Sequence, residues 1–305
     1  MVDLKRLSEE RDILKPFGEL DVLLLYSIVS SELGTFLGGR EIASRVWLKP
    51  RTLLNRGSQL TPLSVEEIAG RVTPELLQTR AKMGLADAKG TLNAVEEKIW
   101  RYFPPRKLCD YFYATNYEGK GREIERIFYD IDRPKDVSHE ISREVTSLFL
   151  ETILSDDQFR VFIRGKPFVA WTGSSFHVYL FLNENQKNSF YTEKIQYTES
   201  DPEKGFTAKW LRAVKEKTQI KVTAGHEKKP GVITIDPSQT PSGKLARAPL
   251  GSLHMSDYET VDGVSIPIET DRLKDQGLTE LLKKYTPKHL VLEMPQFSQI
   301  LRKLS

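Results

Sequence analysis

The 305-residue sequence predicts an α+β fold in which a helical region precedes a larger region that mixes strands and helices. Two observations predict it. Helix-start signals and apolar residues at helical spacing fill residues 1–100, whereas runs rich in aromatic and β-branched residues dominate after YFPPR at 102–106. We therefore expect a domain boundary near residue 100, with an accessory region at 1–100 and the main domain at 101–305.

The first hundred residues carry four helix signals. The apolar stretch at 20–39 predicts a buried N-terminal helix. Ser64 opens the capping-box pattern SVEE, and Thr73 stands before Pro74, a capping residue followed by Pro at the first helical position. Apolar residues recur at helical spacing over 92–100. These signals predict a helical region with no catalytic cluster of its own.

The remainder of the chain alternates strand and helix patterns. An amphipathic helix is expected at 138–154, opened by Ser138, and two more helices at about 206–218 and 278–285. The expected strands are LCDYFYATNY (108–117), RIFYDID (126–132), QFRVFI (158–163), FVAWT (168–172), FHVYLFL (176–182) and GVITID (231–236).

Composition excludes several classes of protein. The single cysteine, Cys109, excludes an internal disulfide framework and a cysteine-rich zinc site, so no structural zinc is expected. The apolar part of 20–39 is too short to span a bilayer. Residues 1–12 lack the basic segment followed by an apolar segment that a signal peptide has. We expect a cytoplasmic protein that does not contact a membrane. Residues 205–252 hold nine Lys or Arg against three acids, a segment that could attract phosphates or be an ordinary solvated surface.

Two aspartates stand close together in IERIFYDIDRP, at 124–134. In a strand, Asp130 and Asp132 project from the same face, where their carboxylates repel each other. A divalent cation removes this conflict, and carboxylate oxygens are the ligands that Mg²⁺ or Mn²⁺ prefers. The same D-x-D pattern occurs in calcium loops, in glycosyltransferases and in capped turns, so the pair by itself leaves these alternatives open.

A third acid ends another apolar strand, GVITID, where Asp236 is followed by Pro237. Three carboxylates delivered by two strand ends could hold two metal ions about 3.5–4 Å apart, the arrangement used for in-line phosphoryl transfer. An Asp before Pro is also a common turn start, which is the alternative for this residue taken singly.

Small residues form a turn in WTGSSFHVYLFL, at 171–182. We expect Ser175 and His177 to share a face of the strand that follows, where a hydroxyl, an imidazole and turn N–H groups would make a phosphate cradle. The alternative is a hairpin turn with a partly buried histidine.

A basic loop, KLARAPLGSLHMSDY, lies at 244–258. It carries Arg247, Ser252 and His254 near a glycine. An arginine can bind a phosphate through two parallel hydrogen bonds. Considered alone, this loop does not indicate a particular function.

Taken in order, these segments resemble the archaeo-eukaryotic primase superfamily, the primase–polymerases. Its pattern is an hhhDhD strand, a small-x-His turn and an apolar strand ending in Asp, for which this chain has IFYDID, SFH and ITID. RAPLGSLH resembles the R-x-P-x-S-L-H element of primase catalytic subunits, and YFPPR…YFYATN resembles the start of their core. The resemblance covers about 102–260. Within this superfamily, the chain looks most like an archaeal plasmid-type primase–polymerase.

The resemblance implies an RRM-like α+β catalytic core that performs template-directed nucleotidyl transfer with Mg²⁺ or Mn²⁺. It implies that Asp130, Asp132 and Asp236 form the metal triad. It further implies that five residues bind the triphosphate of the incoming nucleotide, namely Ser175, His177, Arg247, Ser252 and His254. The implied partners are single-stranded or primed DNA, an NTP or dNTP, and a helicase or accessory primase subunit.

Two other functions stay open at this point. A metal-dependent glycosyltransferase would use Asp130 and Asp132 but would leave SFH, ITID and RAPLGSLH unexplained. A primase-like replication protein that binds nucleic acid without catalysis would be expected to lose at least one of the three acids. The sequence does not distinguish ribonucleotides from deoxyribonucleotides, or primer synthesis from primer extension.

Overall fold

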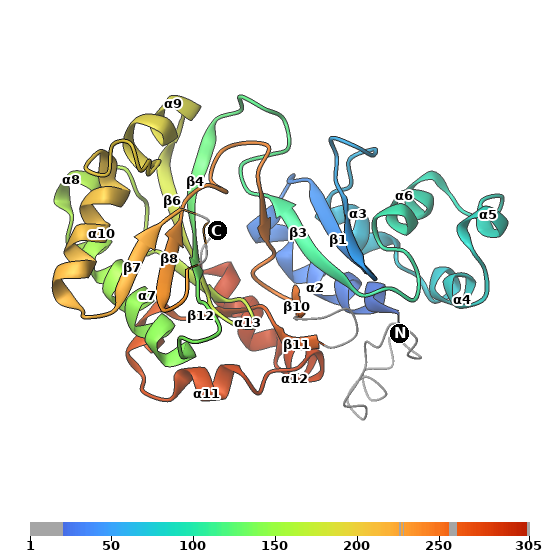
Figure 1. Cartoon of the computed structure of the whole chain (residues 1–305). Helices are drawn as coiled ribbons and strands as arrows, with labels where there is room; N and C mark the ends of the chain where they lie inside the picture. The colour runs from blue at the N-terminus through green and yellow to red at the C-terminus, as the bar shows by residue number, and fades with distance from the viewer. Residues whose placement is uncertain (1–20, 226, 228, 256–260, 304–305) are drawn as a thin grey trace. The chain divides into compact units, whose positions relative to one another are not determined.

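The computed structural model of the chain describes residues 21–225, 227, 229–255 and 261–303. Lys228 of the basic segment and residues 1–12, where no signal peptide was expected, lie outside this description. The chain forms two compact units (Figure 1). Unit 1 takes its described residues from 1–114, 245–266 and 284–305, and unit 2 consists of 115–244 and 267–283.

The expected boundary near residue 100 does not coincide with this division. Strands from both sides of that position pair in one antiparallel sheet of unit 1, which also recruits a strand from after residue 244. Its order is β2 (Arg51–Asn55), β1 (Ile42–Leu48), β3 (Cys109–Ala114) and β9 (Leu245–Arg247). Non-local strand pairing therefore overrides the change in sequence character that suggested the boundary.

A buried helix covers one face of this sheet, as the N-terminal apolar stretch predicted. Helix α2 (Val22–Leu37) has Asp21 as its N-cap, and the hydroxyl of its Tyr26 donates to the main-chain oxygen of Cys109. Ser30 and Tyr111 share a hydrogen bond of 2.7 Å, with either hydroxyl as the donor. Because side chains alternate along β3, Asp110 and Phe112 point away from α2.

The short helices of unit 1 begin at the predicted residues. Ser64 forms a complete capping box, and Thr73 caps a helix that has Pro at its first position. The prediction of an entirely helical region is wrong at 42–55, which is the β1–β2 hairpin. The other described elements are α3 (Val65–Arg71), α4 (Pro74–Lys82), α5 (Leu85–Ala88), α6 (Ala94–Tyr102), β10 (Leu253–Met255), β11 (Val261–Val264), α12 (Pro287–Leu292) and α13 (Met294–Arg302).

Unit 2 is built around a six-stranded sheet. Strand β4 is central and pairs antiparallel with both β6 and β8, whereas β7 and β8 are parallel. The strand order is β12 (Ile266–Ile268), β5 (Phe168–Trp171), β6 (Phe176–Gln186), β4 (Ile124–Asp132), β8 (Val232–Asp236) and β7 (Lys221–Ala224).

Helices α7 (His139–Leu154) and α10 (Gly205–Lys217) cover one face of this sheet. The ring of Tyr129 on β4 lies 5.0 Å from that of Phe149 on α7 and 6.2 Å from that of Trp210 on α10. All three side chains are fully buried, as expected for large aromatic residues in a core. Because β4 alternates, Asp130 and Asp132 project from the opposite face.

Most expected elements of unit 2 are confirmed, but QFRVFI is not a strand. Residues 157–160 form the short helix α8 (Asp157–Arg160), and of the predicted strand Ile163 makes an isolated bridge to Leu182. The Phe159 ring packs 4.6 Å from that of Trp210, and this tertiary contact outweighs strand propensity. The helix expected at 278–285 ends earlier, as α11 (Leu278–Leu282). The remaining elements are α9 (Asn188–Phe190), a π-helix (Tyr191–Ile195) and a 3₁₀-helix (Thr270–Lys274).

Two buried polar side chains extend the pairing of β4. The Thr240 hydroxyl accepts from the Phe128 N–H and donates to the Phe128 carbonyl, both at 3.0 Å. The Asn116 side chain accepts from the Arg126 N–H at 3.1 Å and donates to the Arg126 carbonyl at 2.7 Å. Both residues occupy the place of a neighbouring strand and thereby hold the register of β4.

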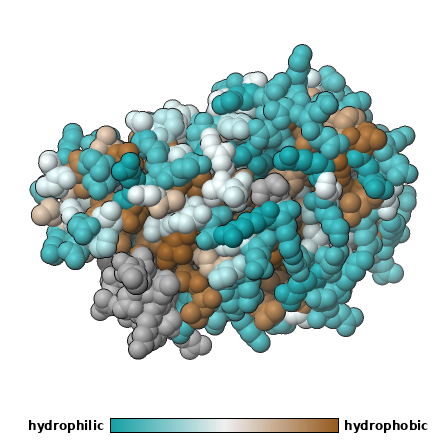
Figure 2. All heavy atoms as spheres, turned by 180° about the vertical axis from the view of Figure 1, so that it is seen from behind, coloured by the Kyte–Doolittle hydropathy of each residue, from teal (hydrophilic) through white to brown (hydrophobic). Residues whose placement is uncertain are grey.

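The surface of the described chain gives no sign of a membrane span. Among the described residues, no helix is both long enough and apolar enough to cross a bilayer. On the face shown in Figure 2, hydrophilic residues predominate and hydrophobic ones gather in separate patches.

We expect Thr240→Val to lower the free energy of unfolding by about 2–4 kcal/mol, because two buried main-chain groups of Phe128 lose their partner. Urea denaturation measures this change. Thr79→Val is the matched control, since its exposed hydroxyl bonds within helix α4 and its loss should change stability by less than about 0.5 kcal/mol. Equal effects of the two substitutions would contradict the role given to Thr240.

Candidate functional site

The pairing register of unit 2 sets three chemically active residues in one row across the sheet. Asp130 on β4 lies directly opposite His177 on β6 and directly opposite Asp236 on β8. Directly opposed residues of an antiparallel pair share a face, with Cβ atoms about 4.5–5.5 Å apart. Asp130 and Asp236, which are more than a hundred positions apart in the chain, are therefore neighbours on the face away from α7 and α10.

Asp132 extends this row by one step along β4. It lies on the same face as Asp130 and opposite Thr234 of β8. The carboxylates are only partly exposed, since the side chain of Asp130 is 22% exposed and Asp236 is 5% exposed. The structure thus brings together the three predicted acids on one face, in an environment where charge is costly unless it is compensated.

His177 is held between aromatic rings and a carboxylate. Its Nε2 lies 3.4 Å from Asp130 Oδ1, and the Tyr179 hydroxyl lies 3.5 Å from its Nδ1. The Phe128 ring meets the imidazole edge-on at 4.7 Å between centroids. A hydroxyl at Nδ1 and a carboxylate at Nε2 favour the tautomer that carries its proton on Nε2. The buried-histidine alternative and the phosphate-cradle hypothesis are both compatible with this placement.

Asp236 makes local hydrogen bonds at the end of β8. Its Oδ1 accepts from the Ser238 N–H at 2.9 Å and its Oδ2 accepts from the Ser238 hydroxyl at 2.8 Å. This is the turn that Asp before Pro predicts. Burial raises the pKa of the nearby Tyr191 phenol, and the negative charge of Asp236 raises it further.

The side chains as they stand do not form a closed metal cluster. Among the described residues, no group of three or more His, Cys, Asp or Glu side chains is arranged to hold a metal ion. Adjacent carboxylates repel one another, and Asp130 and Asp236 each point toward a partner, His177 and Ser238 respectively. The backbone register groups the acids, and two of them contact His177 and Ser238.

Ser175 does not share the face of His177, which corrects the sequence-based expectation. Its hydroxyl donates to the main-chain oxygen of Ile131 and lies 3.0 Å from that of Ser142 on α7. Its N–H donates to the Thr172 hydroxyl at 3.1 Å. The alternation rule fails because Ser175 belongs to the turn before β6 and not to the strand. The hydroxyl of Ser175 thus ties the turn to β4 and α7, and its N–H stabilises the turn itself.

Arg133, which sequence reasoning did not single out, also holds this turn. It follows Asp132 directly and donates from Nε to the Ser174 carbonyl at 3.2 Å. Its Nη1 donates to the Val137 carbonyl, and its Nη2 lies 3.0 Å from His139 Nε2. The arginine thus links the end of β4 to the small-residue turn and to the start of α7. Its position next to the D-x-D pair was the signal available in the sequence.

The other three predicted residues belong to unit 1. Arg247 on β9 lies 3.4 Å from Asp110 and donates to the Leu253 carbonyl. Ser252 is fully buried, and its hydroxyl has no hydrogen-bond partner within the described part of the chain. His254 Nδ1 lies 3.5 Å from Asp262 on β11. Hence five predicted site residues lie in unit 2 and three in unit 1.

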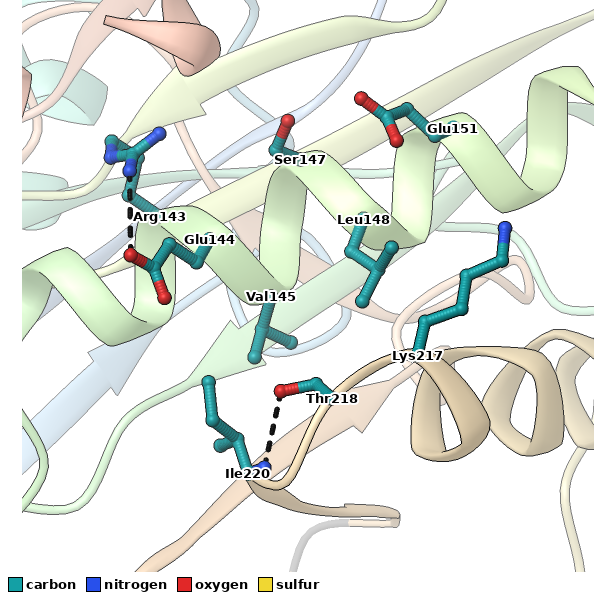
Figure 3. A pocket seen from close by; sticks show the side chains of 9 residues that line it. All are labelled: Arg143, Glu144, Val145, Ser147, Leu148, Glu151, Lys217, Thr218 and Ile220. Atoms are coloured by element: carbon teal, nitrogen blue, oxygen red, sulfur yellow. Dashed lines mark hydrogen bonds and ion pairs between the residues drawn. The ribbon is translucent and has the colours of Figure 1, made fainter. Parts of the chain in front are cut away.

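A separate hollow lies on the helical side of unit 2. It is bounded by residues 143–151 of α7 and by residues 217–220 at the end of α10, with charged side chains around Val145, Leu148 and Ile220 (Figure 3). None of the predicted site residues lines it, and α7 packs on the sheet face opposite to Asp130. The hollow is therefore not part of the candidate site.

Comparison with known proteins identifies the fold. The polymerase domain from Mycobacterium tuberculosis Ligase D, solved in complex with DNA, is similar with a TM-score of 0.56 and 14% sequence identity; the match covers 93% of this chain and 90% of that domain. The predicted α+β fold class is thereby confirmed, with a polymerase domain as the similar structure. No family model and no curated protein matches the chain.

His139 should make stability depend on pH. Burial, together with the charges of Arg133 and Lys283, lowers the pKa of His139 from 6.5 to about 4. In the unfolded chain the imidazole therefore binds a proton between pH 6.5 and 4 that the folded protein excludes, and stability falls as pH falls through this window. Carboxylates titrate in the lower part of the same window, so a variant is needed to isolate the histidine.

His139→Gln keeps an acceptor for Arg133 but cannot titrate there. We expect its free energy of unfolding to fall less than that of the wild type between pH 6.5 and 4, and to run parallel to it above pH 6.5. Urea denaturation of both proteins at stepwise pH measures this difference. Parallel curves over the whole range would contradict the assignment.

Proposed function

We propose that the chain is a template-directed primase–polymerase, which transfers a nucleotide from an NTP or dNTP to a 3′-hydroxyl on single-stranded or primed DNA. The observation that carries this proposal is the row of His177, Asp130 and Asp236 across three strands, with Asp132 on the same face. The likeness to a polymerase domain solved with DNA adds support.

Three aspartates would bind Mg²⁺ or Mn²⁺ through their carboxylates. Asp130, Asp132 and Asp236 offer hard oxygen donors on one face, and each carboxylate has about four lone-pair sites. Asp236 can therefore keep its hydrogen bonds to Ser238 while it coordinates a cation. When bound, the metal ions would acidify the attacking hydroxyl and offset the negative charge of the triphosphate.

The remaining residues would bind and orient the nucleotide. His177 would donate from Nε2 to a phosphate oxygen in place of Asp130, and the rings of Phe128 and Tyr179 fix its plane. Arg247, Ser252 and His254 are the other residues that we propose for phosphate binding, as the resemblance implies. Ser175 acts by positioning, because its hydroxyl ties the turn to β4.

Replacement of the acids tests this proposal. Asp130→Asn, Asp132→Asn and Asp236→Asn should each lower nucleotide incorporation on a primed template by about 100-fold or more, because each removes a charged metal ligand. Electron paramagnetic resonance of Mn²⁺ should show weaker metal binding in the same variants. Asp271→Asn is the control, since this carboxylate is 86% exposed and lies on the 3₁₀-helix that follows the edge strand β12.

Retained incorporation by the folded double variant Asp130→Asn/Asp132→Asn would refute the assigned site. Assays of the wild-type protein separate the other functions. Transfer from labelled UDP-sugars in place of dNTPs would identify a glycosyltransferase. Metal-independent DNA binding without incorporation in Mg²⁺ or Mn²⁺ would identify a non-catalytic nucleic-acid-binding protein.

A further inference from the structure

On the sheet of unit 1, two arginines share one buried carboxylate. Asp110 on β3 has no exposed surface, and the Trp47 indole N–H donates to its Oδ1 at 3.0 Å. Its Oδ2 lies 3.8 Å from Arg45 Nη1 and 3.4 Å from Arg247 Nη1. Within the described part of the chain, two guanidinium groups thus face one buried carboxylate in this cluster.

Strand register explains why these groups meet. Arg45 on β1 lies opposite Asp110, and Arg247 on β9 lies opposite Phe112, which is two residues further along β3. The guanidinium carbons of Arg45 and Arg247 lie 4.7 Å and 5.3 Å from the centre of the Phe112 ring. The cluster therefore occupies the sheet face opposite to that covered by α2.

The electrostatics of the cluster favour a second anion. Both guanidinium groups approach the same oxygen, so they also repel each other. Burial lowers the pKa of Arg45, and the charge of Arg247 lowers it further, against the attraction of Asp110. The Arg45 side chain is nevertheless 38% exposed and that of Arg247 is 16% exposed, so a small anion can reach them from solvent.

We propose that Arg45 and Arg247 form a phosphate-binding pair that Asp110 positions. The planar guanidinium fork matches phosphate oxygens, and stacking on Phe112 restricts the plane of each fork. The ligand is a phosphate group, carried either by a nucleotide or by a nucleic-acid strand. This inference rests on the proposed function for the source of the phosphate, and it adds Arg45 and Asp110, which the sequence did not indicate.

A purely structural role makes a different prediction. If Arg45 served only as a counter-ion that links β1 to β3, its loss would lower stability and leave phosphate affinity unchanged. Binding must therefore be measured directly and apart from incorporation. The probes are inorganic tripolyphosphate, dATP and a single-stranded oligonucleotide, each at one fixed salt concentration in equilibrium dialysis.

We expect Arg45→Gln to bind tripolyphosphate about tenfold more weakly than the wild type, because it loses a charged hydrogen-bond donor. Arg51→Gln, an exposed arginine of the same hairpin, is the matched control and should bind like the wild type. Arg45→Lys keeps the charge without the planar fork and should give an intermediate affinity. It also keeps the test usable if the glutamine variant unfolds.

The three probes separate the sources of the phosphate. If Arg45→Gln binds only tripolyphosphate and dATP more weakly, the pair binds the phosphates of a nucleotide. If it binds only tripolyphosphate and the oligonucleotide more weakly, the pair binds a nucleic-acid strand. Equal affinity of Arg45→Gln and Arg51→Gln for all three probes would overturn the inference. Because incorporation is not measured, this result is independent of the outcome for the three aspartates.

Discussion

The arrangement of unit 2 depends on the pairing register of β4 with its neighbours β6 and β8. The register that places Asp130 between His177 and Asp236 also turns Tyr129 toward α7 and α10. A slip of one residue would bury the carboxylates under the helices and expose the aromatic ring. Burial of the apolar face therefore fixes where the acids lie.

Charge is distributed differently on the two sheets. The face of the unit 2 sheet that carries Asp130 gathers three carboxylates against His177, so it favours cations. In unit 1, Asp110 is outnumbered by Arg45 and Arg247, so that cluster favours anions. The two sheets therefore gather charge of opposite sign on these faces.

Local patterns in the sequence were sufficient for much of the fold. Alternation and β-branched content located β4, β6 and β8, and the capping residues Ser64, Thr73 and Ser138 located three helix starts. The same patterns nominated the strand-end acids, because a carboxylate at the end of an apolar strand is locally unfavourable and thus conspicuous. They also predicted the fold class that the likeness to a polymerase domain confirms.

Contacts between distant segments decided the rest. Packing of Phe159 on Trp210 made a helix of the start of QFRVFI, and a turn outside the strand directed Ser175 toward Ile131. Strand pairing also placed Arg45 and Arg247 on one carboxylate. Sequence alone determined most of the strands and helices, because periodicity and capping act within a few residues. The tertiary structure alone decided which side chains meet, because strand register depends on pairing across the whole chain.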